Sequence, residues 1–165
     1  MYNMYIEPRQ KGGSCIEFSQ KKLPIGIENF AKLQAEDFYY VDKTMLIKEL
    51  LDNWAEMNLF TRPRRFGKSM AANMLAAYYD RSESTEELFK NLSISKDDSY
   101  KENLNQYDVI KINMQEFLSM AGTMEDMLGM LKNYLISDFA ETYPEVRFRD
   151  EKNLIQVMKD VFSYT

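Results

Sequence analysis

The chain has 165 residues and a mass of 19.5 kDa, which suits one domain, since domains commonly run to roughly 100–200 residues. Its net charge of −5 and pI of about 4.9 argue against a broad non-specific nucleic-acid surface, because such surfaces need clustered Lys and Arg. It has no histidine and one cysteine, Cys15, which excludes Ser-His and Cys-His catalytic arrangements and any disulfide within the chain.

The N-terminal region predicts an arm followed by a globular domain. Residues 1–22 are polar and glycine-containing, and we expect an irregular arm or small β-hairpin there, with the domain over 23–165. A short helix is predicted over 28–37 and a brief strand over 38–41. The start of the chain lacks the features of a signal peptide and no apolar run is long enough to span a membrane, so we expect a cytoplasmic protein.

The segment after residue 41 predicts an amphipathic helix with Asp42 as its N-cap. Apolar residues follow Asp42 at the three- and four-residue spacing of one helix face. They are Leu46, Ile47, Leu50, Leu51 and Trp54. Next come a short apolar segment at 57–61, a basic loop at 62–69 and a second amphipathic pattern at 69–80, which together predict a strand, a loop and a helix.

The loop RPRRFGKS at 62–69, here called the phosphate loop, matches the second half of the Walker A pattern G-x-x-x-x-G-K-[ST]. Gly67 would let the backbone approach phosphates, Lys68 would reach the β- and γ-phosphates, and the Ser69 hydroxyl would bind Mg²⁺. The predicted nucleotide-binding residues are Arg62, Pro63, Arg64, Arg65, Phe66, Gly67, Lys68 and Ser69. The alternative is a basic, solvated turn that simply begins a helix.

The C-terminal half predicts one further strand and several helices. A short helix capped by Ser84 and Glu87 is expected up to residue 89, and an apolar strand over 107–114. Amphipathic helices are expected over 123–140 and 153–162. The whole pattern predicts a mixed α/β domain with few strands and mostly helices.

Several stretches of this chain resemble the bacterial AAA-ATPase-like family. They are LPIGIENF at 23–30, FYYVDKT at 38–44, LIKELLDN at 46–53, NLFTRPRRFGKSM at 58–70, LFKNLSI at 88–94 and DVIKINMQEF at 108–117. In that family an RPRRFGK-type loop replaces the ordinary Walker A, so Arg62 in place of its first glycine fits the resemblance.

This resemblance implies an incomplete P-loop NTPase domain of the α/β class that binds ATP and Mg²⁺. Family members often carry a nuclease-like domain of the restriction-endonuclease superfamily after the ATPase domain. The implied phosphate-binding residues are Gly67, Lys68 and Ser69. The DKT stretch carries over to Asp42 and Lys43, for which the resemblance gives no role.

The resemblance also implies a Walker B strand ending in Asp-Glu after the helix NLIQVMKDVFSYT, and the chain ends before it, at Thr165. The strand VIKINMQEF places Asn113 and Glu116 near its end, but Glu116 reads as a solvated residue at a helix entry. No catalytic carboxylate is assigned, so we expect weak hydrolysis or none.

Two functions remain open from the sequence. One is a nucleotide-binding domain that binds ATP with Mg²⁺. The other is a non-catalytic protein-binding module, such as an inhibitor of a host protein carried by a phage or mobile element. The chain could also be a piece of a longer enzyme. Because the family's strand order would leave 57–61 and 107–114 without neighbours, we expect a homodimer or a tight protein complex.

Overall fold

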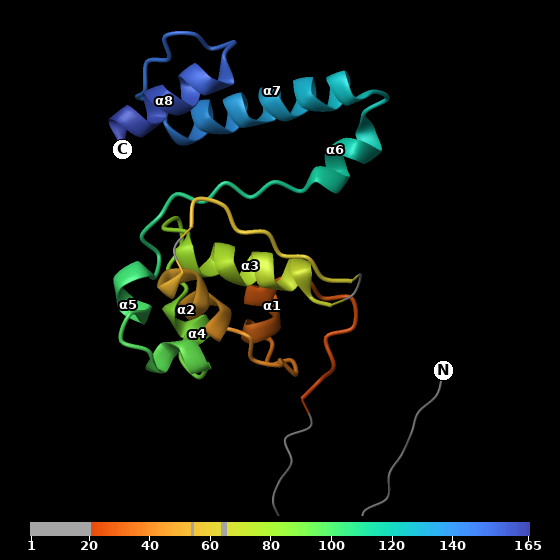
Figure 1. Ribbon diagram of the computed structural model, residues 1–165, viewed down its shortest axis with the longest axis vertical. Coiled ribbons are helices and arrows are strands. Elements are labelled where there is room, and N and C mark those ends of the chain that lie inside the picture. The colour runs from red at the N-terminus through yellow and green to blue at the C-terminus, as the bar shows by residue number, and fades with distance from the viewer. Residues whose placement is uncertain (1–20, 54, 64–65) are drawn as a thin grey trace, which may run out of the picture. The chain divides into compact units, whose positions relative to one another are not determined.

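The computed structural model describes residues 21–53, 55–63 and 66–165 (Figure 1). Over those residues the chain forms eight α-helices and one 3-10 helix. It divides into two compact units, Met1–Val109 and Ile110–Thr165. Of the predicted N-terminal arm, residues 1–20 lie outside the described residues. No described helix combines the length and the apolar character that crossing a membrane requires.

The first unit is a cluster of helices around an aromatic core. Its helices are α1 (Phe30–Ala35), α2 (Met45–Asp52), α3 (Lys68–Tyr79), α4 (Glu86–Phe89), the 3-10 helix η1 (Ser93–Lys96) and α5 (Tyr100–Asn103). The ring of Phe89 packs against those of Phe30 and Tyr78, with centroids 5.1 and 5.7 Å apart. Tyr78 and Met74 of α3 are fully buried in this core, so the core anchors the helix that follows the phosphate loop.

The second unit consists of α6 (Met114–Met120), α7 (Met124–Thr142) and α8 (Leu154–Tyr164), in which α7 packs against both of the others. The Thr123 hydroxyl accepts the Asp126 amide (3.1 Å) and so caps α7. The Asn153 side chain caps α8 by accepting the Ile155 amide (3.1 Å). The predicted helices over 123–140 and 153–162 are therefore confirmed.

The predicted α/β fold is wrong: the described residues are helical and contain no strand or sheet. The nearest approach to one is an isolated parallel bridge between Asp80 and Tyr107. There the Tyr107 amide donates to the Tyr79 carbonyl and the Arg81 amide donates to the Tyr107 carbonyl, each at 2.9 Å. A single bridge does not make a ladder.

The physical reason is that a strand exists only when its backbone pairs with another. At 57–61 the predicted strand is unpaired within the described chain, and Met57 and Leu59 are 89% and 88% exposed. At 107–114 no strand forms beyond the single bridge at Tyr107, and the end of the segment enters a helix, because the Asn113 side chain accepts the Gln115 amide (3.2 Å) and caps α6. The brief strand expected over 38–41 is absent from the described chain too.

Candidate functional site

Gly67 is the residue at which the phosphate loop becomes a helix. It has φ 75° and ψ 26°, in the left-handed region that residues with a Cβ avoid, and it is the N-cap of α3. Its carbonyl accepts the Ala71 amide (2.9 Å), the first hydrogen bond of the helix. The glycine of the Walker-type pattern is thus required by backbone conformation at this position.

The N-terminus of α3 is open. No described side chain caps it, and no acidic residue stands in its first turn. The first amide groups of a helix have no partner within the helix and carry partial positive charge, so this end attracts an anion. All of the described loop residues are solvent-exposed, and the side chains of Arg64 and Arg65 lie outside the described part.

Lys68 and Ser69 form the first turn of α3 at this open end. The Lys68 ammonium donates to the carbonyl of Arg62 (2.6 Å), so it folds back over the loop toward the loop's first residue. The Ser69 side chain is exposed and makes no hydrogen bond within the described chain. Both side chains therefore stand where a phosphate and its metal ion would be accessible to them.

The rest of α3 is fixed firmly while its N-terminus is exposed. The Asn73 amide group donates to the Glu28 carbonyl (2.6 Å), and the Tyr40 hydroxyl donates to the Met74 sulfur (3.4 Å). Met74 is fully buried. A rigid helix presenting an exposed loop is the arrangement expected of a preorganised binding site.

Asp42 does not cap α2 as predicted. The N-cap is Thr44, two residues later, and Asp42 instead fastens the chain before α2 to η1. One carboxylate oxygen accepts the amide (2.9 Å) and the hydroxyl (2.6 Å) of Thr44, and the other accepts the Ser93 amide (2.7 Å). Burial raises the pKa of Asp42, but these donors outweigh burial, and the pKa lies below its usual value.

Thr44 completes this fastening and is fully buried. Its hydroxyl oxygen accepts the amide of Ile94 (3.2 Å), so 42–44 and 93–94 are held together by both side chains. No local pattern in the sequence indicates these partners, because they are about fifty residues apart. We name this contact, between Asp42 and Thr44 on one side and Ser93 and Ile94 on the other, the 42–94 clamp.

Lys43 lies between the two clamp residues and reaches the phosphate loop. Its ammonium stands 3.8 Å from the point that a Cβ on Gly67 would occupy. The structure therefore brings Lys43 to the loop, whereas Asp42 turns to η1. Glu116 belongs to the second unit, where it accepts a hydrogen bond from the Asn113 amide group (3.0 Å). Its side chain is exposed, which agrees with the prediction of a solvated residue.

Comparison with known proteins adds a family to this geometry. The family model described as "Predicted AAA-ATPase" matches residues 24–165, which include the phosphate loop and the 42–94 clamp. A stretch of 77 residues is 44% identical to an uncharacterized protein in the vnfD 5' region of Azotobacter chroococcum mcd 1. That stretch is 46% of this chain and 14% of the relative, so this chain spans a small part of that protein. No solved structure matches.

Proposed function

This chain belongs to the predicted AAA-ATPase family, and we propose that its phosphate loop binds ATP together with Mg²⁺. The proposal rests on the conformation of Gly67. This residue has a left-handed backbone and lies at the N-terminus of a twelve-residue helix that no side chain caps within the described chain. An anion there would receive hydrogen bonds from backbone amides that are otherwise unpaired. The family match supports the choice of the phosphates of a nucleoside triphosphate as this anion.

Lys68 and Ser69 supply the side-chain chemistry of this proposal. The Lys68 ammonium would exchange the carbonyl of Arg62 for phosphate oxygens, which are stronger acceptors because they are charged. The Ser69 hydroxyl would supply one oxygen ligand to Mg²⁺. Magnesium takes oxygen ligands, keeps several waters and binds nucleotide phosphates directly, so one protein hydroxyl at this position fits it. The ion would offset the charge of the phosphates.

We further propose that this chain turns ATP over slowly or not at all. The carboxylate nearest to Lys43 in sequence, Asp42, has both oxygens engaged by Thr44 and Ser93 and so does not serve as a base for water. We expect turnover well below ~1 s⁻¹, the low end of ordinary enzymes. Faster turnover that Lys68→Ala abolishes would contradict this part of the proposal.

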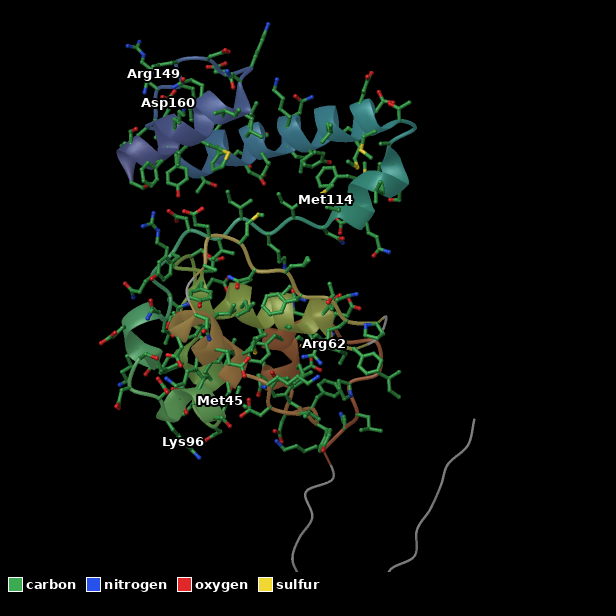
Figure 2. The ribbon with its side chains drawn as sticks, in the orientation of Figure 1. Met45, Arg62, Lys96, Met114, Arg149 and Asp160 are labelled. Atoms are coloured by element: carbon green, nitrogen blue, oxygen red, sulfur yellow. The ribbon has the colours of Figure 1, made fainter. Side chains whose placement is uncertain are left out.

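The binding proposal is tested by thermal unfolding with and without ATP and Mg²⁺. A ligand at 100 times its Kd stabilises a protein by about 2.7 kcal/mol, which for a chain of this size raises Tm by roughly 5–10 °C. We expect that shift in the parent and in Lys96→Ala, and its loss in Lys68→Ala. Lys96 is a suitable control because it is an exposed lysine of η1, away from Arg62 (Figure 2). An equal shift in Lys68→Ala would refute the phosphate-loop assignment.

A second candidate function, a non-catalytic protein-binding module, is favoured by a different observation. Large apolar side chains next to and within the phosphate loop are exposed: Met57 by 89%, Leu59 by 88% and Phe66 by 60%. Exposed apolar groups gathered in one segment are typical of surfaces that another protein covers. The two functions separate in the thermal experiment, since a protein-binding module would show no response to ATP.

A further inference from the structure

Lys43 is placed at the phosphate loop by a part of the chain that lies outside the loop. Its ammonium stands 3.8 Å from where a Cβ on Gly67 would be, and the glycine leaves that space open. Gly67 is also the N-cap of α3, so this ammonium and the uncapped helix end share one location. Two independent sources of positive charge therefore meet at the same glycine.

The position of Lys43 is set by its neighbours. Thr44 is fully buried, and Asp42 accepts three hydrogen bonds, so the residues on either side of Lys43 are fastened to η1 through the 42–94 clamp. The backbone of Lys43 is held by these contacts. Its long side chain retains its freedom beyond that fixed point, which suits a group that must reach a ligand.

The charge of Lys43 is uncompensated within the described chain. Its ammonium makes no ion pair or hydrogen bond there, and the adjacent carboxylate of Asp42 is occupied by amide and hydroxyl donors. Lys68 follows Gly67 directly. Its ammonium donates to a carbonyl and makes no ion pair within the described chain. Positive groups on both sides of Gly67 raise the local positive potential, and a bound anion would relieve their mutual repulsion.

We propose that Lys43 is a second ammonium of the phosphate site and binds phosphate oxygens of the nucleotide directly. Asp42 and Thr44 are positioning residues that hold it there. This inference rests on the proposed function and deepens it, because it adds a ligand group that the Walker-type pattern does not contain. It also gives the DKT stretch a chemical role.

The test is calorimetric titration of the whole chain with ATP and Mg²⁺. Loss of one hydrogen bond to a charged group costs about 1.5–3 kcal/mol, so Lys43→Ala should weaken binding at least about tenfold. Lys43→Arg should retain the parent's affinity within about threefold, because the charge and the donors remain. Lys96→Ala, the removal of another exposed lysine, should bind as the parent does.

Two further measurements exclude a merely structural role. The unliganded melting temperature of Lys43→Ala should equal that of the parent, and its affinity should depend less steeply on salt, since one cation has left the site. Parent-like affinity in Lys43→Ala, or an equal loss in Lys43→Arg, overturns the inference. If Lys43→Ala binds normally while Lys68→Ala does not bind, only Lys43 is excluded. If the parent binds no ATP, the proposed function itself fails and the inference fails with it.

Discussion

Replacing Thr44 by valine tests whether the 42–94 clamp stabilises the first unit. Valine has nearly the same shape, so it removes the hydroxyl without opening a cavity. That hydroxyl donates to Asp42 (2.6 Å) and accepts from the Ile94 amide (3.2 Å), and Ile94 is fully buried. The amide would be left buried without a partner, which costs about 1–3 kcal/mol. The Asp42 carboxylate would still accept the backbone amide of residue 44, so losing the hydroxyl donor costs Asp42 less than losing the hydroxyl acceptor costs the Ile94 amide. We expect destabilisation of about 2–3 kcal/mol in total.

Urea unfolding followed by circular dichroism measures this change. The midpoint should fall without a change in slope, and Tm should fall by roughly 5–15 °C for a unit of this size. The matched control is Thr61→Val, because Thr61 is exposed and makes no hydrogen bond within the described chain. That variant should stay within about 0.5 kcal/mol of the parent. Equal stability of Thr44→Val and the parent would show that the clamp does not hold this unit together.

Two more predictions follow from the same structure. Because the folded pKa of Asp42 lies below its unfolded value, its contribution to stability is present above the unfolded pKa and is lost as pH falls through the folded pKa. Asp42→Asn should therefore lower Tm at pH 7 and flatten the acid limb of a Tm-against-pH profile; an unchanged acid limb would contradict the direction of the shift. For association, we expect light scattering at micromolar concentration to give a mass above the 19.5 kDa of one chain. A Met57→Glu, Leu59→Glu double variant should return it to one chain, because both side chains are largely exposed. A monomeric parent would reject this expectation.

The helices could be predicted because their signals are local. The apolar spacing after Asp42 predicts a helix, which the structure shows at Met45–Asp52. The spacing after Ser69 predicts another, which the structure shows at Lys68–Tyr79. The Ser84 capping box indicated the right helix but a start that is too early, since α4 begins at Glu86 after Thr85. Errors of one or two residues are expected where caps compete.

The strands could not be predicted because pairing is not a local property. The sequences at 57–61 and 107–114 have the apolar composition of strands, and that composition says nothing about which segment will pair with them. At 107–114 a local signal also competes, because Asn113 is a good N-cap and begins α6. The N-cap prediction for Asp42 is wrong for a related reason. Local spacing predicts that its carboxylate caps the nearest helix, whereas the carboxylate accepts hydrogen bonds from Thr44 and from Ser93, which is remote in sequence.

The phosphate loop and the 42–94 clamp differ in how much of each the sequence reveals. Gly67, Lys68 and Ser69 are contiguous, because a helix N-terminus is built from consecutive residues, and a pattern search finds them. Lys43 reaches the same glycine through the fold, since its neighbours are fastened to η1. Its position therefore depends on the first unit being folded, whereas Lys68 needs only α3. If both ammonium groups bind phosphate, Thr44→Val should weaken ATP binding by less than Lys43→Ala under conditions where the variant remains folded. Weakening beyond that of Lys43→Ala would mean that the clamp shapes the loop itself.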